Sequence, residues 1–277
     1  MEPGVARTYG VELLLDEPPR IDKRELLERL RRGCGNVAPV GGDDKPDLLL
    51  FAHLDHPIVY TDRTIPAQCL VALSDKPVDG QRYEPVLQQT RDWADAREVV
   101  AHCRASLLVT DFLASRLQYK TRLALFHSVL LSVLDLAPCL AIHWQPSQRL
   151  VQPEAYLSAR RADEPDPLFP GVNVRLFRVE DRAPGEMVMD TLGLAALGVP
   201  DLQCHFVELD PNAVATMLHN SAYYLFERGD VIEDGHTIQG IGPNPRWRCR
   251  HEMALVEPER VVIDVNPGPP YVAGNRN

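Results

Sequence analysis

The stretch DLLLFAHLDHPIVYTDRTIPAQCLVAL, residues 47–73, predicts several strands in succession with no helix between them. Residues 47–53 are almost continuously apolar, which is typical of a central strand. We expect further strands at residues 58–60 and 67–73, joined by a turn at residues 61–64. Adjacent strands of this kind indicate an α+β fold rather than a doubly wound sheet.

The sequence before and after this stretch adds helices to the strands. A strand at residues 9–15 precedes a helix at residues 23–32, for which Asp22 is the expected N-cap residue and Gly33 the end. The longest helical pattern covers residues 115–136, between strands expected at residues 106–110 and 139–144. Helical or mixed structure is expected at residues 84–90 and 93–102.

The C-terminal part is also expected to combine strands with a helix. Strands are expected at residues 173–179, 186–191, 202–209, 247–251 and 261–265. Asp210 and Pro211 mark the start of a helix that Gly229 ends. We therefore expect mixed or antiparallel sheets packed against helices.

A proline-rich, charged segment at residues 160–170 is the best candidate for a linker or a long surface loop. It divides an N-terminal α+β region, residues 1–160, from an acidic C-terminal α+β module, residues 161–277. The sequence leaves open whether these are two halves or one intertwined domain.

Charge and composition limit the possible partners. The 277 residues have a net charge of −10, and residues 151–277 hold 19 acidic against 11 basic groups. Such a surface disfavours nucleic acid and anionic membranes and attracts cationic partners, although solubility alone also explains it. With no long apolar run, no secretory signal and six widely spaced cysteines, the chain is expected in the cytoplasm with reduced thiols.

No dinucleotide-binding, phosphate-binding, nucleophile-elbow or zinc-protease motif occurs in the sequence. The densest group of catalytic residue types is His53, Asp55 and His56, which follows an apolar strand. It could serve a hydrolase as an acid–base pair or a metal site. The alternative is a strand end with two polar imidazoles, and we expect no catalytic residues.

Two neighbouring pairs, Cys204-His205 and Cys249 with His251, offer four potential zinc ligands. Adjacent residues in a strand point to opposite faces, so core cysteines on two strands explain them better. We expect neither a metal nor a cofactor.

Three segments in the C-terminal part resemble a known family. The order MDTLGLAALGVPDLQ (residues 189–203), a helix ending in Tyr223-Tyr224-Leu225, and DVIEDGHTI (residues 230–238) resemble the C-terminal module of the domain of unknown function 4261 family of bacterial proteins. Residues 13–19, 65–68 and 141–151 are similar to earlier parts of that family. His236 departs from it, since an acidic residue is expected after the glycine.

The family is uncharacterised, and the resemblance supplies no catalytic residues. Some members resemble products of toxin–antitoxin or effector–immunity neighbourhoods. This implies a non-catalytic cytoplasmic immunity protein that binds a basic toxin domain and occludes its active-site cleft. The candidate contacts are acidic residues with two tryptophan anchors, namely Asp163, Glu164, Asp166, Glu180, Asp181, Glu186, Asp230, Glu233, Asp234, Trp144 and Trp247.

Overall fold

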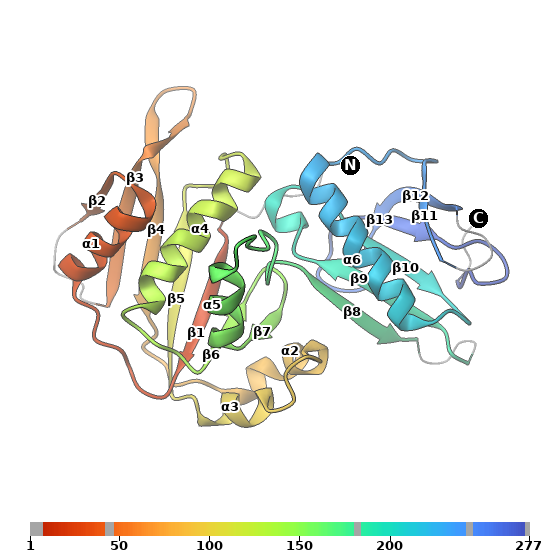
Figure 1. Cartoon of the computed structure of the whole chain (residues 1–277), viewed down its shortest axis with the longest axis horizontal. Coiled ribbons are helices and arrows are strands. Elements are labelled where there is room, and N and C mark those ends of the chain that lie inside the picture. Colours follow the sequence, from red (N-terminus) through yellow and green to blue (C-terminus); the bar gives the residue numbers. More distant parts are fainter. Residues whose placement is uncertain (1–7, 42–46, 180–183, 242–245, 275–277) are drawn as a thin grey trace. The chain divides into compact units, whose positions relative to one another are not determined.

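The computed structural model describes residues 8–41, 47–179, 184–241 and 246–274. The chain divides into two compact units, one spanning Ala6–Pro170 and the other beginning at Gly171. Each unit has its own sheet with helices packed on it (Figure 1). The predicted α+β fold with mixed or antiparallel sheets is confirmed.

The N-terminal unit contains a seven-stranded antiparallel sheet in the order β2-β3-β4-β5-β1-β6-β7. The strands, in chain order, are β1 Gly10–Leu15, β2 Val37–Val40, β3 Leu48–Val59, β4 Thr64–Leu73, β5 Ala105–Phe112, β6 Ala141–Trp144 and β7 Arg149–Val151. The expected strand at residues 58–60 is the end of β3, which continues past an irregularity in register between His53 and Pro57. Pairing with β4 on both sides of that irregularity keeps β3 a single strand.

Helices cover both faces of this sheet. Helices α1 Lys23–Cys34, α4 Tyr119–Leu134 and α5 Pro153–Arg161 lie on one face, where Tyr9, Phe126 and Trp144 form an aromatic cluster (Figure 1). Helices α2 Glu84–Gln89 and α3 Ala96–His102 pack over part of the other face. Asp22 caps α1 as expected, because its carboxylate accepts from the backbone N–H groups of Arg24 and Glu25 at 2.9 Å.

The expected boundary at residues 160/161 falls in the last turn of α5. Tyr156 of this helix is fully buried and its ring stacks against His127 of α4, at 5.8 Å between ring centroids. This packing keeps α5 and the following loop in the N-terminal unit, which ends at Pro170.

The C-terminal unit contains a six-stranded mixed sheet in the order β11-β12-β13-β10-β9-β8. The strands are β8 Asn173–Arg178, β9 Met187–Leu192, β10 Asp201–Phe206, β11 Thr237–Gln239, β12 Arg246–Met253 and β13 Val261–Asn266. β10 and β13 are parallel, and the other paired neighbours are antiparallel. Helix α6, Pro211–Arg228, packs on β8, β9 and β10.

The signals that predicted α6 are present in the structure. Asp210 accepts from the backbone N–H of Asn212 at 3.1 Å, and Pro211 occupies the first helical position. The helix ends at Gly229, whose φ of 81° lies in the region that favours glycine. These signals therefore set where α6 begins and where it ends.

Candidate functional site

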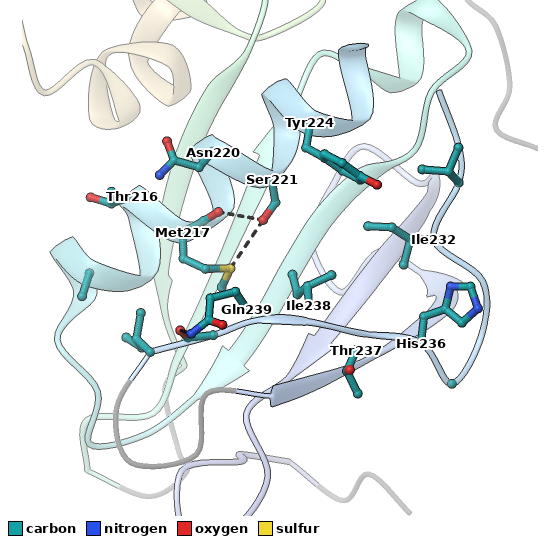
Figure 2. Close-up of a pocket in the computed structure, with 15 residues that line it drawn as sticks. Thr216, Met217, Asn220, Ser221, Tyr224, Ile232, His236, Thr237, Ile238 and Gln239 are labelled. Atoms are coloured by element: carbon teal, nitrogen blue, oxygen red, sulfur yellow. Dashed lines mark hydrogen bonds between the residues drawn. The ribbon is translucent and has the colours of Figure 1, made fainter. Parts of the chain in front are cut away.

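A groove of about 1070 Å³ opens on the C-terminal unit between α6 and residues 231–241 (Figure 2). Its helical wall is a stripe of side chains three or four residues apart, which places them on one face of α6. These side chains belong to Ala213, Thr216, Met217, Asn220, Ser221 and Tyr224. The stripe lies beside the buried core face of α6, so the helix serves both the core and the groove.

The lining of the groove combines buried apolar side chains with an exposed aromatic ring. Met217 and Ile232 are 7% and 5% exposed, whereas the Tyr224 ring is 52% exposed. Figure 2 shows Met217 and Tyr224 on α6 facing Ile232 and Ile238 across the hollow. The Ser221 hydroxyl donates to the backbone carbonyl of Met217 at 2.8 Å, so this hydrogen bond lies within α6. This arrangement suits a ligand with apolar groups.

The opposite wall is held in place by contacts with β12. The backbone N–H of Gly235 donates to the carbonyl of Cys249 at 2.8 Å. Gly240 lies directly on the indole of Trp247, because a Cβ built at this glycine would be 2.4 Å from the ring. A side chain at residue 240 would therefore push the wall away from the sheet.

Three carboxylates line the turn that leads into this wall. The side chains of Asp230, Glu233 and Asp234 are 34%, 83% and 62% exposed. We call these three residues the acidic rim. A tight turn is present at Asp234-Gly235, with φ +87° at the glycine. It precedes β11, so it does not itself join the two strands of a hairpin.

His251 contacts two carboxylates of the acidic rim. One Asp234 oxygen accepts from the backbone N–H of His251 at 2.7 Å and lies 2.9 Å from His251 Nδ1. Asp230 lies 3.3 Å from the other ring nitrogen of His251. The backbone N–H of His251, followed by its ring, lowers the pKa of Asp234, so this rim carboxylate is charged at neutral pH.

A second set of carboxylates in the same unit is buried. Asp190 and Asp201 are 0% exposed. Arg175 donates to both oxygens of Asp190, at 3.0 and 2.6 Å. Arg260 bridges the pair, reaching Asp190 at 2.6 Å and Asp201 at 3.2 Å. Two arginines thus compensate two buried negative charges.

Asp201 also organises the turn after β9. Its two oxygens accept from the backbone N–H groups of Gly193, Leu194 and Ala195 at 3.1–3.3 Å. Burial raises the pKa of Asp201, and Arg260 opposes that change. The sequence motif at residues 189–203 therefore has a structural role. Its Asp201 holds the turn after β9 and binds Arg260, which lies in a loop distant in the sequence.

The predicted acidic contacts occupy several different places. Asp163 and Glu164 are exposed in the N-terminal unit, whereas Asp166 is half-buried and accepts from the backbone N–H groups of Leu168 and Phe169. Asp230, Glu233 and Asp234 come together in the acidic rim of the C-terminal unit. Glu180 and Asp181 lie outside the described residues.

Three predicted contacts are core residues. Glu186 is 6% exposed, and its carboxylate lies 2.8 Å from Nε2 of His205. Trp144 and Trp247 are 0% and 1% exposed, so neither indole offers a surface to a partner in this structure. Trp144 donates from Nε1 to the Tyr9 hydroxyl at 2.9 Å. These large aromatic side chains are buried by the packing of the folded units. The sequence around a single position does not show that packing.

The group at residues 53–56 contributes to the fold. His53 is 1% exposed, and burial, together with nearby His56, lowers its pKa to about 4. Asp55 accepts from the backbone N–H of Asn36 at 2.7 Å, which fixes the turn between α1 and β2. In this arrangement the His53 ring is enclosed, and the carboxylate of Asp55 is bound to the backbone.

The two Cys–His pairs lie on β10 and β12, with β13 between these strands. Cys204 and Cys249 are buried, whereas His205 bonds to Glu186 and His251 to the acidic rim. Across the described ranges, no three His, Cys, Asp or Glu side chains are grouped as a metal ion requires. Within the same ranges, none of the helices has the length and apolarity needed to cross a bilayer.

The groove-lining positions on α6 were not predicted as a site from the sequence. Tyr224 belongs to the segments that carry the family resemblance, and the stripe around it contains both polar and apolar residues. On α6, a second row of side chains lies next to the buried row. This second row is the sequence signal that could have indicated the groove.

Comparisons with known proteins give one match. No curated protein and no solved structure matches the chain. Residues 190–266 match the model of a family described as "Domain of unknown function (DUF4261)". This segment includes α6, the groove and the acidic rim, whereas the resemblances at residues 13–19, 65–68 and 141–151 lie outside it. Over residues 190–266, the chain is therefore similar to the DUF4261 family.

Proposed function

We propose that the protein is a non-catalytic binding protein that acts in the cytoplasm as an immunity protein against a cognate secreted toxin. Its contact surface is the groove of the C-terminal unit together with the acidic rim. The observation that supports this proposal is a set of three exposed carboxylates within residues 230–236, the segment that also supplies Val231 and Ile232 to the groove wall. A basic active-site cleft of a toxin would be complementary to this surface.

The acidic rim contributes mainly to the rate and specificity of the encounter. Exposed charges steer a partner of opposite sign and are screened by salt within about 8–10 Å at physiological ionic strength. The net charge of −10 strengthens this long-range attraction. Binding by this surface should therefore weaken as salt is added.

The groove contributes most of the affinity. Apolar surface that a partner covers is removed from water, and each Å² contributes about 25 cal/mol before the costs of association. Tyr224, at 52% exposure, and Val231, at 44%, are the large side chains available for this contact. A partner bound here would cover both apolar walls and place basic groups at the acidic rim.

The test is binding and inhibition with the toxin domain encoded beside this gene. The full chain should co-purify with that domain, inhibit its activity at equal molar amounts, and bind less tightly at about 300 mM than at about 50 mM salt. If the neighbouring product neither binds nor is inhibited, the proposed function is wrong.

A matched pair of variants locates the surface. Glu233→Lys reverses a rim charge, and Glu259→Lys reverses an exposed charge of the same unit outside the acidic rim. The first should weaken binding by roughly two- to fivefold and the second should not. Equal effects of the two variants would remove the acidic rim from the contact surface.

A further inference from the structure

Strand β12 carries three arginines at alternate positions, Arg246, Arg248 and Arg250. We call these three residues the arginine row. Trp247 and Cys249, which lie between them in the sequence, are buried, whereas all three arginines are exposed. Because alternate side chains of a strand point to opposite faces of the sheet, the arginine row lies on one face of β12 and the buried side chains on the other.

Neutral residues flank two members of the arginine row on the neighbouring strands. Thr237 of β11 and Asn266 of β13 both pair directly with Arg248. Gln239 of β11 pairs directly with Arg246. Directly paired residues point to the same face of the sheet, so the neighbours of these two guanidinium groups are a hydroxyl and two amides, which do not neutralise their charge.

Carboxylates adjoin the arginine row at Arg250. Asp264 of β13 pairs directly with Arg250 and is 4% exposed. Asp234 of the acidic rim is also near, since the contacts with His251 lower the pKa of Asp234 most and the charge of Arg250 adds to that effect. The charge of Arg250 is therefore partly balanced by the fold.

The charges of Arg246 and Arg248 are not balanced in this way. Across the described residues, no ion pair or side-chain hydrogen bond involves a guanidinium group of the arginine row. Glu252, the next residue on the same face of β12, is half-buried and accepts from Nε2 of Gln203 at 2.7 Å. A chain with a net charge of −10 thus presents an exposed positive row on one strand.

Two other arginines of the same unit have carboxylate partners inside the protein. Arg175 and Arg260 both bind the buried Asp190, at 2.6 Å in each case. These two ion pairs hold buried charge in the fold, whereas the arginine row is exposed to solvent. The arginine row is therefore available to a partner.

The spacing of the arginine row indicates the chemistry of that partner. Alternate residues of a strand are roughly 6.6 Å apart, so the three positions span roughly 13 Å. Carboxylates on alternate residues of an extended peptide repeat at the same interval. Each guanidinium group presents a planar set of donors that matches one carboxylate with two hydrogen bonds.

A nucleic-acid strand fits this face less well. Sites for single strands combine basic groups with aromatic side chains on which the bases stack. The residues that pair directly with the arginine row are Thr237, Gln239, Asn266 and Asp264, and none of the four is aromatic. The net charge of −10 also repels a long polyanion.

We infer that the arginine row binds an extended acidic segment of a protein partner, in which carboxylates on alternate residues each meet one guanidinium group. A single exposed ion pair contributes little, so the affinity depends on the matched spacing of all three. This inference does not depend on the proposed function, because the surface proposed there attracts a basic partner.

The experiment measures binding to the full chain by fluorescence anisotropy at about 20 mM salt, where exposed charges are least screened. Two labelled ten-residue peptides contain the same four glutamates among threonines, either at alternate positions or as two adjacent pairs. A third peptide has lysines at the alternate positions, and the fourth probe is a labelled oligothymidylate of ten nucleotides.

The alternating glutamate peptide should bind with a Kd below about 1 mM. The peptide with paired glutamates should bind at least about threefold more weakly, and the lysine peptide and the oligothymidylate at least about tenfold more weakly. No binding of the alternating peptide, or equal binding of the two glutamate peptides, would overturn the inference. Tighter binding of the oligothymidylate would replace the acidic segment with a nucleic acid.

A matched pair of substitutions locates the site. Arg248→Glu reverses the central charge of the arginine row, and Arg178→Glu makes the same change at an exposed position of β8. The first should weaken binding of the alternating peptide by roughly fivefold or more, and the second by less than about twofold. Equal effects would show that the peptide responds to the net charge and would overturn the inference.

A milder variant protects this test against a loss of folding. Arg248→Gln keeps a polar side chain at the exposed position and should weaken binding by roughly two- to fivefold. Its urea midpoint should equal that of the wild type, because the side chain that it replaces is exposed. Wild-type affinity of folded Arg248→Gln would contradict the role of the arginine row.

Discussion

The C-terminal unit contains two sets of carboxylates with opposite environments. Asp190 and Asp201 are completely buried and paired with Arg175 and Arg260. The acidic rim is exposed, and its carboxylates lie beside histidine rings. Both sets lie within residues 190–266, so a family match alone does not distinguish them.

The contrast between the two sets shows that burial decides whether an acidic residue stabilises the fold or is available to a partner. A buried carboxylate must be paired, and its loss leaves charged or polar groups without a partner. An exposed carboxylate contributes little to the stability of the fold and remains available for a partner. Substitutions in the first set should therefore change unfolding, and those in the acidic rim should change binding.

The largest effect is expected from Asp201→Ala. The substitution removes one of the two carboxylates that Arg260 binds, and it leaves the backbone N–H groups of the turn after β9 without their acceptor. Breaking a buried pair of this kind costs about 3–5 kcal/mol of unfolding free energy, measured by urea denaturation. Glu259→Ala, at an exposed position, is the control, and a loss below about 1 kcal/mol for Asp201→Ala would contradict the structural role.

The second effect extends the contrast to a buried histidine of the N-terminal unit. Burial lowers the pKa of His53 to about 4, and neither ring nitrogen has a hydrogen-bond partner in the described structure. Between pH 6.5 and 4 the unfolded chain binds a proton that the folded chain does not. Stability should therefore fall as the pH is lowered through this window.

His53→Leu should remove about 2–3 kcal/mol of that pH dependence, measured as denaturation midpoints between pH 7 and 4. His102→Gln replaces an exposed histidine and should leave the dependence unchanged. The same pH profile for wild type and His53→Leu would show that this histidine is accessible to protons in the folded protein.

A smaller effect on the unfolding free energy is expected at an exposed carboxylate of the N-terminal unit. Asp22 is exposed, yet it caps α1 through two backbone N–H groups. Asp22→Ala should lower the unfolding free energy by about 1 kcal/mol in urea. Glu28→Ala, at an exposed position inside the same helix, should change it by less than about 0.5 kcal/mol. Equal losses would mean that the cap contributes nothing specific.

The smallest effect on the fold is expected at the acidic rim itself. Glu233→Gln should leave the urea midpoint unchanged, because its side chain is 83% exposed. The same variant should slow association with a basic partner, measured by stopped-flow at low salt, and the difference should disappear at high salt. A rate that remains slow at high salt would indicate a role other than electrostatic attraction.

Local signals in the sequence predicted much of the fold. Asp22, Asp210, Pro211 and Gly229 set helix ends by contacts with nearby backbone groups, so their roles are visible in a short window. Strands β2 and β7 were missed because they have only four and three residues, too few for a clear alternation. The boundary at Pro170 depends on packing of α5, which the charged loop after it does not reveal.

The site was harder to predict because it depends on long-range contacts. Charge density indicated Asp230, Glu233 and Asp234, but it could not show that Glu186 is buried beside His205. Arg260 pairs with Asp190 across 70 residues, which no local pattern encodes. The groove arises from α6 and β11, which meet only in the folded unit.

Hydrogen exchange of the full chain, measured with and without the basic toxin domain, tests the central proposal most directly. We predict that binding slows exchange in residues 230–241, which contain the acidic rim and β11, and leaves the sheet of the N-terminal unit unchanged. Slower exchange confined to other segments, with residues 230–241 unaffected, would contradict the account.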